Sequence, residues 1–476
     1  MAKVKAQPTP APHDLYPGLQ PERVQLLNDD PVREDGHYVL YWMQQSQRSE
    51  LNHALEYAIH RANELEQPLL VAFGLMDGYP EANLRHYHFL LQGLADVEAA
   101  LAKRSVPFVV QRGAPDEVAL RLAADAALVV CDRGYLRPQR QWREHVAAAA
   151  GCAVVQVESD VVVPVELASD HQEHAARTIR PKITRHLDRF LVDLPQTKLK
   201  DTAAPEVEGE DLSDLDTLLL SLDLDHTVRP VPLFTGGTSA ATAVLQRFLR
   251  DQFADYAANR NQPQTDHVSH MSKYLHFGQI SPIAIALAIS EQGEDENVST
   301  YLEELIVRRE LPMNFVYHQP DYDQYSCLPA WARTTLAEHA GDPREPGYTA
   351  RELEDAATDD PYWNAAMTEM KELGYLHNHM RMYWGKKILE WSATPEEAYA
   401  TTLRLNNTYF LDGRDANSFA NVAWVYGQHD RGWGERAVFG KTRSMTAGGL
   451  ERKTDPKAYV AKVEREVEEV RRAANA

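Results

Sequence analysis

The sequence has few cysteines, and none of them belongs to a recognisable metal-binding or redox motif. Its 476 residues include Cys131, Cys152 and Cys327, and no two of these have the spacing of a zinc site or a redox pair. We therefore expect neither disulfides nor a bound metal, as is usual in a reducing cytoplasm.

Long apolar runs are also missing. No uninterrupted run approaches the length of a membrane span, and the opening residues MAKVKAQPTPAPHDLYPG lack the apolar stretch that a signal peptide requires. We expect no membrane partner, no export and a cytoplasmic location. Residues 1–36 are interpreted as a disordered N-terminal arm.

Positive charge is scarce, with 49 Lys and Arg against 70 Asp and Glu and a formal net charge of −21. Such a balance disfavours nucleic acid as a partner, although binding follows the local field. Residues 205–225 hold eight acids and no Lys or Arg, whereas residues 431–453 hold six bases against two acids. A basic groove on an acidic body is therefore compatible with the sequence, and the acidic run is interpreted as a solvated linker.

The usual phosphate-binding fingerprints are absent as well, since neither GxGxxG nor a Walker loop occurs. What the first half does contain is alternation of short apolar runs with amphipathic stretches. The apolar runs, interpreted as buried strands, are 37–43, 68–75, 107–113, 127–135 and 153–165. Helical spacing falls between them, at 49–65, 84–104 and 115–125. This order predicts a doubly wound parallel sheet in an α/β domain over 37–194, with ligands at the carboxyl ends of the strands.

The second half has no strand pattern. Residues 195–240, rich in Asp, Glu, Pro, Ser and Thr, are interpreted as a long interdomain linker. Helical periodicity then returns at 241–260, 280–292, 301–311, 361–374 and 377–391. We therefore predict an all-α second domain over residues 241–476.

The segment HNHMRMYWGKKILEW, residues 377–391, places Trp384 and Trp391 seven residues apart. On a helix this is about two turns, or roughly 10 Å, so both indoles lie near one face. The two interpretations are a row of core tryptophans and a row of oxidisable rings that passes electrons to a redox cofactor.

Other blocks also carry chemistry. In HVSHMSKYLHFG, Ser269 and Ser272 stand at an expected helix start, where hydroxyls and unpaired N–H groups form either a seat for a diphosphate or a plain N-cap. Glu304 lies about one turn from Arg308 and Arg309 and is either an active-site acid or one half of a surface salt bridge. In HDRGWGERAVFGKTR, Trp433 stands between two glycines among cations, a pattern that favours contact with phosphates and bases.

Five blocks in this order, 267–282, 303–315, 377–391, 406–419 and 429–443, together resemble the cyclobutane pyrimidine dimer photolyases, and within them the class II branch. The resemblance implies an antenna-type α/β domain, a linker and an all-helical FAD-binding domain. It implies a monomeric enzyme that repairs cyclobutane pyrimidine dimers in UV-damaged duplex DNA, by light-driven electron transfer from reduced, anionic FAD to a flipped-out dimer. The antenna chromophore that it favours is 8-hydroxy-5-deazaflavin, with a folate or none as alternatives. A cryptochrome-like light sensor without repair activity is the rival interpretation.

The resemblance also assigns residues. Glu304 would hydrogen-bond the lesion, which requires a protonated carboxyl group. Arg381 and Asp412 would form an ion pair beside the flavin ring, and Asn406, or alternatively Asn417, would face flavin N5. The remaining flavin contacts would be Tyr256, Ser269, His270, Met271, Ser272 and Gln279. Trp384, Trp363 and Trp391 would conduct electrons, in an order left open. Contacts with DNA would come from Arg308, Trp424, Arg431, Trp433, Lys441 and Arg443, although Arg308 stands where relatives can carry an aromatic residue.

Overall fold

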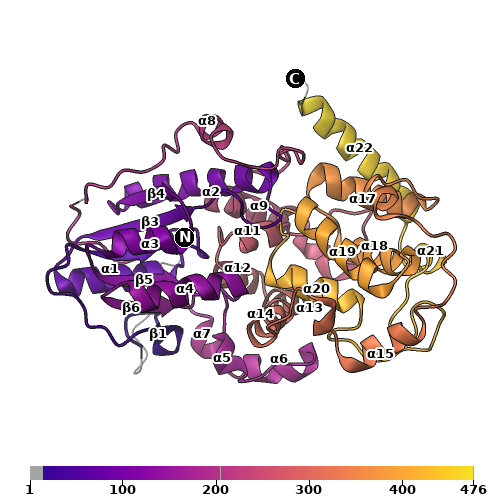
Figure 1. Cartoon of the computed structure of the whole chain (residues 1–476), viewed down its shortest axis with the longest axis horizontal. Helices are drawn as coiled ribbons and strands as arrows, with labels where there is room; N and C mark the ends of the chain where they lie inside the picture. The colour runs from indigo at the N-terminus through magenta and orange to yellow at the C-terminus, as the bar shows by residue number, and fades with distance from the viewer. Residues whose placement is uncertain (1–13, 204, 475–476) are drawn as a thin grey trace.

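The computed structural model describes residues 14–203 and 205–474, with a sheet domain at one end and a helical domain at the other (Figure 1). The sheet has the order β1-β6-β5-β2-β3-β4, and every neighbouring pair is parallel except β1 and β6. The strands are β1 (Val24–Leu26), β2 (Tyr38–Trp42), β3 (Leu69–Leu75), β4 (Phe108–Arg112), β5 (Ala126–Asp132) and β6 (Ala153–Val157). The predicted doubly wound fold is confirmed.

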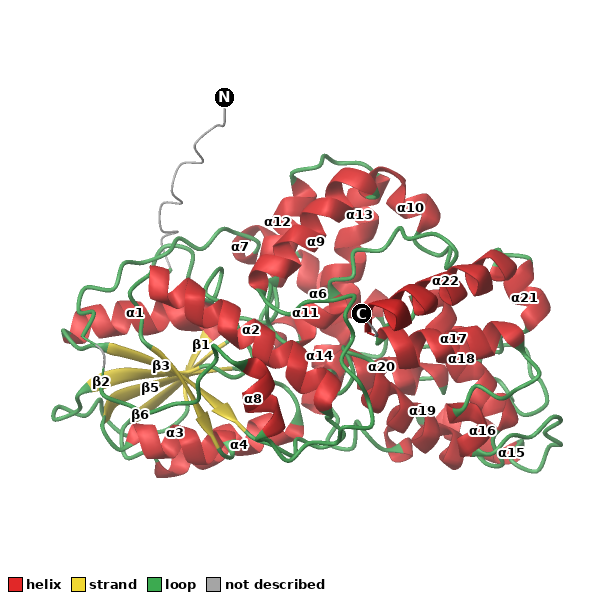
Figure 2. Cartoon of the chain, turned by 90° about the horizontal axis from the view of Figure 1, so that it is seen from above, coloured by secondary structure: helices red, strands yellow, loops and turns green. Residues whose placement is uncertain are grey.

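Both faces of the sheet are covered, which explains the continuous apolar runs. Val39 and Tyr41 of β2 pack under α1 and α2, whereas Leu40 and Trp42 pack against α3 and α4. Figure 2 shows these two pairs of helices on opposite sides of the strands. The covering helices are α1 (His53–Leu65), α2 (Leu84–Lys103), α3 (Pro115–Ala123) and α4 (Arg137–Ala149).

Part of the expected N-terminal arm is ordered. Residues 1–13 lie outside the described residues, but Val24–Leu26 forms β1 and pairs antiparallel with β6. The preceding 3₁₀ turn, Pro21–Arg23, buries the Arg23 guanidinium, which donates to the carbonyls of Glu158, Val161 and Val162. These bonds tie the segment to the sheet, so residues 14–36 belong to the folded first domain rather than to a disordered arm.

The connection between the domains is packed rather than free. Helices α5 (Val165–Ala168), α6 (Ala176–Thr184) and α7 (Leu187–Phe190) follow the sheet. Within the acidic run, α8 (Leu215–Leu220) buries Leu218 and Leu219 against Leu91 and Leu94 of α2. The leucines that alternate with the acids therefore dock this segment onto the first domain.

The second domain is helical, as predicted. Its helices are α9 (Thr238–Asp251), α10 (Tyr256–Asn259), α11 (Ser272–His276), α12 (Pro282–Ser290), α13 (Glu296–Leu302), α14 (Arg309–His318), α15 (Ala330–Glu338), α16 (Ala350–Glu354), α17 (Pro361–Leu373), α18 (Asn378–Trp391), α19 (Pro395–Tyr409), α20 (Ala416–Val425), α21 (Ala447–Glu451) and α22 (Pro456–Ala474). Short 3₁₀ turns lie at Phe253–Asp255 and Tyr325–Cys327.

A π-helical turn, Glu303–Arg308, joins α13 to α14. Pro312 follows inside α14, and its ring leaves no N–H for the carbonyl of Arg308 in an ordinary α-helical turn. Wide turns of this kind are rare and occur mostly at functional sites. This one carries Glu304 and Arg308.

Among residues 14–203 and 205–474, no helix combines the length and apolar character needed to cross a membrane, and no group of side chains is suited to hold a metal ion. The three cysteines are buried and unpaired.

Candidate active site

The helical domain encloses a cavity of about 290 Å³ between α10, α11, the π-helical turn, α18 and α20. We call it the central cavity. It brings together most of the residues that the sequence placed at the site. Those on its wall are Tyr256, Ser269, His270, Met271, Ser272, Glu304, Arg381, Asp412 and Asn417.

A charged pair stands on this wall. Arg381 Nη2 lies 2.8 and 2.9 Å from the two carboxylate oxygens of Asp412, and its Nε donates to the carbonyl of Leu376 at 3.0 Å. Burial by itself would raise the pKa of Asp412, but Arg381, helped by Ser272, holds that pKa below its usual range. The guanidinium also lies 3.9 Å from the ring centre of Phe410. The pair is therefore fixed and ionised.

Glu304 pairs with a residue that the sequence did not single out. Its carboxylate lies 2.8 Å from Arg260 Nη2, with 36% of the Glu304 side chain exposed. Arg260 also lines the cavity and stands 5.8 Å from the ring centre of Tyr256. The only signal in the sequence was its spacing of four residues after Tyr256, one helical turn.

The neighbouring Glu303 organises the rim. It accepts both guanidinium hydrogen bonds of Arg180 from α6, at 2.9 and 2.6 Å, and one from Arg308 at 3.2 Å. Residues five apart align in a π-helix, so the wide turn makes the contact between Glu303 and Arg308 natural. Arg308 in turn lies 5.8 Å from the ring centre of Trp424.

The segment Ser269–Ser272 leads into α11. Ser269 Oγ accepts from the Tyr301 hydroxyl at 2.8 Å, and His270 adopts a left-handed backbone with φ 55°. Burial lowers the pKa of His270 to about 4, against the opposing effect of Asp266. Behind this segment, burial lowers the pKa of Lys273 to about 7, and its ammonium lies 3.6 Å from the ring centre of Phe234.

Two predicted flavin contacts lie off the wall. Gln279 accepts from Gly237 N at 2.8 Å and donates to the carbonyl of Phe89 at 3.3 Å, so its amide joins the two domains instead. Asn406 is buried at the end of α19 and donates to Asn407 at 3.0 Å. Of the two asparagines considered for flavin N5, Asn417 is the one that lines the cavity.

The three tryptophans form a connected row through the core. The Trp363 indole donates to the carbonyl of Trp384 at 3.0 Å, and its ring centre lies 5.5 Å from that of Trp391. At the inner end, Trp384 meets Phe410 at 6.2 Å, and Phe410 touches the cavity pair through Arg381. At the outer end, Trp391 meets the partly exposed Tyr348 at 5.1 Å.

The remaining predicted contacts lie on the C-terminal loop. Trp433 is 42% exposed, and the guanidinium groups of Arg431 and Arg443 lie 5.2 and 5.5 Å from its ring centre. Lys441 is exposed, and its carbonyl accepts from Trp433 N at 2.8 Å.

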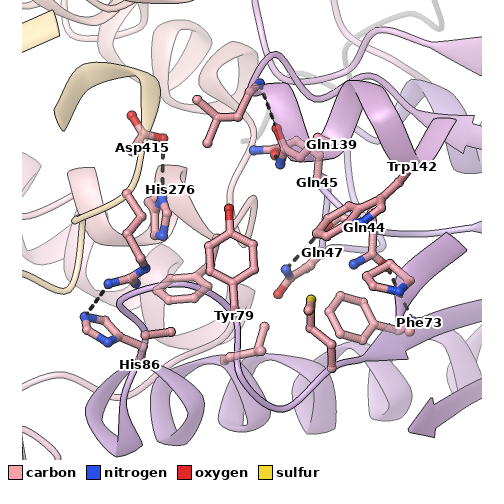
Figure 3. Close-up of a pocket in the computed structure, with 18 of the residues that line it drawn as sticks. Gln44, Gln45, Gln47, Phe73, Tyr79, His86, Gln139, Trp142, His276 and Asp415 are labelled. Atoms are coloured by element: carbon pink, nitrogen blue, oxygen red, sulfur yellow. Dashed lines mark hydrogen bonds and ion pairs between the residues drawn. The ribbon is translucent and has the colours of Figure 1, made fainter. Parts of the chain in front are cut away.

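A further cavity of about 140 Å³ lies at the carboxyl ends of the parallel strands, where the fold predicts a ligand. Figure 3 shows Trp142, Gln44 and Phe73 at one end of this pocket and His86 and His276 at the other. We call it the sheet-edge pocket.

The two cavities share a wall. His276 and Asp415 line both, and their side chains lie 3.4 Å apart. Burial opposes the charge on Asp415, yet His276 and Arg309 outweigh burial and hold its pKa at about 2.

Comparison with known proteins identifies the family. Residues 39–202 match the DNA photolyase family. The deoxyribodipyrimidine photo-lyase of Methanothermobacter thermautotrophicus is 50% identical over 446 residues, covering 94% of this chain and 98% of the relative. That of Oryza sativa subsp. japonica is 39% identical over 463 residues, covering 93% and 90%. An archaeal photolyase from Sulfolobus tokodaii, solved with two FAD molecules, superposes with a TM-score of 0.68 at 16% identity, over 89% of each chain. The chain therefore belongs to the DNA photolyase family, as an enzyme of the deoxyribodipyrimidine photo-lyase kind.

Proposed function

We propose that this chain repairs cyclobutane pyrimidine dimers in DNA under light, with FAD held in the central cavity. The observation that carries the proposal is the ionised pair Arg381–Asp412 on the wall of a cavity that also presents Glu304. The relatives named deoxyribodipyrimidine photo-lyase support it over nearly the full length of the chain.

The chemistry of the cavity suits a flavin dinucleotide. Ser269 and Ser272 offer hydroxyls for a diphosphate, and the buried His270 Nδ1 has no hydrogen-bond partner within the described residues. Tyr256 and Tyr301 supply aromatic surface. Bound, reduced FAD supplies the electron that light sends to the dimer, while the chain binds and orients.

Each wall residue then has a role. The fixed guanidinium of Arg381 favours an anionic ring beside it, and Asp412 keeps the guanidinium in place. Glu304, in its protonated form, donates a hydrogen bond to the carbonyl oxygen on which negative charge develops. Arg260, now paired with Glu304, releases it when a lesion phosphate takes the place of the carboxylate. Asn406 and Asn417 stay the two candidates for the position at flavin N5.

The tryptophan row carries electrons inward to restore the reduced state. We order it as Trp391 outermost, Trp363 in the middle and Trp384 innermost, because Trp363 is the member of the three that contacts both of the others. Indoles pack well while they conduct, so the core role and the redox role coexist. This row and the five sequence blocks are our grounds for the class II assignment.

Duplex DNA is the proposed partner, held by Arg308, Trp424, Arg431, Trp433, Lys441 and Arg443. Cations neutralise phosphates, and an indole fills the gap that a flipped dimer leaves. Action as a monomer and a cytoplasmic location stay predictions.

The sheet-edge pocket is the proposed antenna site. Its aromatic and amide lining, with Trp142, Phe73 and Gln44, suits a flat heteroaromatic chromophore with polar edges, and 8-hydroxy-5-deazaflavin is our choice over a folate. The wall shared with the central cavity supports this site, because a chromophore bound there would lie close to a flavin in the central cavity.

A repair assay tests the proposal. The chain is loaded with FAD, reduced, mixed with a duplex that carries one thymine dimer, and illuminated with blue light. We expect the ultraviolet absorbance of intact thymines to return, with a dark sample and a (6-4) lesion as controls. If the chain binds the dimer and the absorbance never returns, the light-sensor alternative replaces repair.

A further inference from the structure

A third cavity, of about 370 Å³, lies on the C-terminal side of the helical domain. We call it the basic cavity. Four cations line it, together with Trp433 and His379. The cations are Arg436, Arg443, Arg452 and Lys453.

None of the four cations is ion-paired within residues 14–203 and 205–474. The two acids of the same stretch of sequence are engaged elsewhere. Glu435 lies 3.0 Å from His339 Nε2, and Glu451 accepts from the Tyr362 hydroxyl at 2.7 Å. Over the part of the chain that the structure describes, the lining of the basic cavity thus holds four cations and no acid, in a chain whose net charge is −21. The acid beside it, Asp430, accepts from the Trp433 indole N–H at 3.2 Å.

The pKa of His379, which lines the same cavity, responds to these positive charges. Burial, together with the positive charges of Lys453 and Arg443, lowers the pKa of His379. Its Nε2 is buried and has no hydrogen-bond partner among the described residues. An anion in the cavity would relieve the repulsion among the cations and offer acceptor oxygens to them.

The basic cavity adjoins the central cavity. Asn378 and His379 are consecutive at the start of α18, and the first lines the central cavity while the second lines the basic one. Gln262, from the loop after α10, also donates to the carbonyl of Lys453 at 3.2 Å. A strand whose nucleotide enters the central cavity would pass its next phosphates over this site.

We propose that the basic cavity binds backbone phosphates of the DNA strand beside the flipped nucleotide, through Arg436, Arg452 and Lys453 together with Arg443. Hydroxyls of Thr442, Ser444 and Thr446 on the same wall complete a donor set suited to phosphodiester oxygens. This inference rests on the proposed function and adds residues to its DNA-binding surface.

The test compares the FAD-loaded wild type with Arg436→Gln, Arg452→Gln and Lys453→Gln, singly and combined. Affinity for a dimer-containing duplex is measured over a range of salt concentrations. Each lost phosphate contact should reduce the slope of log K against log salt by about 1, and the triple variant should bind about tenfold more weakly or worse. All three side chains are exposed, so folding, flavin content and light-driven flavin reduction should be unchanged.

Arg247→Gln is the matched control, because Arg247 is exposed on α9, away from α21 and the loop that carries Arg436 (Figure 1). If the triple variant keeps the salt slope of the wild type, or if Arg247→Gln lowers it equally, the inference is wrong. Inorganic pyrophosphate is the probe for a free anion. If it binds the cavity without displacing the duplex, the site serves a small anion and the assignment to DNA is wrong.

Failure here and failure of the proposed function are distinguishable. A wild type that repairs dimers alongside a triple variant with an unaltered salt slope removes only the inference. A wild type that never repairs, alongside a triple variant that binds undamaged duplex more weakly, removes the proposed repair activity and retains the basic cavity as a DNA site.

Discussion

At the scale of single residues, the pair Arg381–Asp412 combines burial with full ionisation. Its side chains are 19% and 11% exposed, so little water reaches them and each charge is compensated mainly by the other. Removing one partner of such a pair costs far more than removing an exposed one, because a charge is left without compensation.

Asp412→Asn should therefore destabilise the fold by about 3 kcal/mol and release most of the bound flavin. Thermal unfolding and flavin absorbance per chain measure both effects. Asp251→Asn is the control, since its pair with Arg250 is exposed and screened by solvent, so its loss should leave stability nearly unchanged. An Asp412→Asn variant that keeps its flavin and its melting temperature would contradict the role given to this pair.

Trp391→Phe should abolish most of the light-driven reduction of bound flavin, because it interrupts the row at its outer end. Repair by enzyme that has been reduced chemically beforehand should be unchanged. The absorbance of the flavin during blue illumination measures its reduction, and the absorbance of intact thymines measures repair. Trp331→Phe, at a partly exposed tryptophan of α15 outside the row, is the control. Equal reduction rates in both variants would rule out this path.

At the scale of elements, the π-helical turn holds the cavity rim through Glu303. Glu303→Gln keeps the shape of the side chain and weakens its ion pairs with Arg180 and Arg308. These pairs are half-exposed, so stability should change by less than about 1 kcal/mol. Affinity for dimer-containing DNA should fall, because Arg308 is no longer held beside Trp424. Glu390→Gln, which weakens the pair with Lys387, is the control, and an unchanged affinity in Glu303→Gln would show that Arg308 needs no support.

The C-terminal helix α22 docks on α17 through a buried acid. The Tyr459 hydroxyl donates to Glu369, and burial raises the pKa of Glu369 to about 7 from 4.5. Between these two values the folded chain keeps a proton that the unfolded chain loses, so this group makes stability fall as pH rises. Glu369→Gln should flatten the dependence of the melting temperature on pH across this window. Above pH 7 the substitution should raise the free energy of unfolding by up to about 3 kcal/mol. Parallel curves for the two proteins would contradict this account.

Elements with strong periodicity were predictable from the sequence, and locally weak ones were not. The buried strands β2 to β6 are visible as apolar runs, but the three residues of β1 gain their stability from Arg23 and β6, which no local pattern reveals. Helix α4 begins with the polar run RPQRQWRE, so its apolar face is hard to see. The wide turn at Glu303 depends on tertiary packing and on Pro312.

The candidate site divides in the same way. Arg381 and Asp412 lie 31 residues apart, and only the family resemblance paired them before the fold did. The pattern at Gln279, a polar residue after a glycine turn, is equally compatible with a ligand contact and with a hydrogen bond between domains, and the structure shows the second. Arg260 was missed because its one signal, a spacing of one helical turn after Tyr256, does not distinguish a cavity residue from a solvated one.

At the scale of the whole molecule, the two cavities of different domains meet at His276 and Asp415. Filling the sheet-edge pocket should then affect light collection without affecting repair chemistry. Ala82→Trp places a large ring on the wall of that pocket. We expect it to prevent uptake of 8-hydroxy-5-deazaflavin and to lower repair under dim light, while repair under saturating light is retained. Action spectra of both proteins measure this, and an unchanged spectrum in the loaded variant would place the antenna elsewhere.

The acid-rich stretch around α8 lies over the sheet domain, while the basic cavity beside α21 lies toward the opposite end (Figure 1). Such a separation makes the charge distribution of the molecule asymmetric along its length. The field of a polyanionic duplex would orient the approaching protein before contact. First collisions would then involve the end that carries the basic cavity. Acidic side chains on the rest of the surface would be repelled by the DNA phosphates, which disfavours encounters in other orientations.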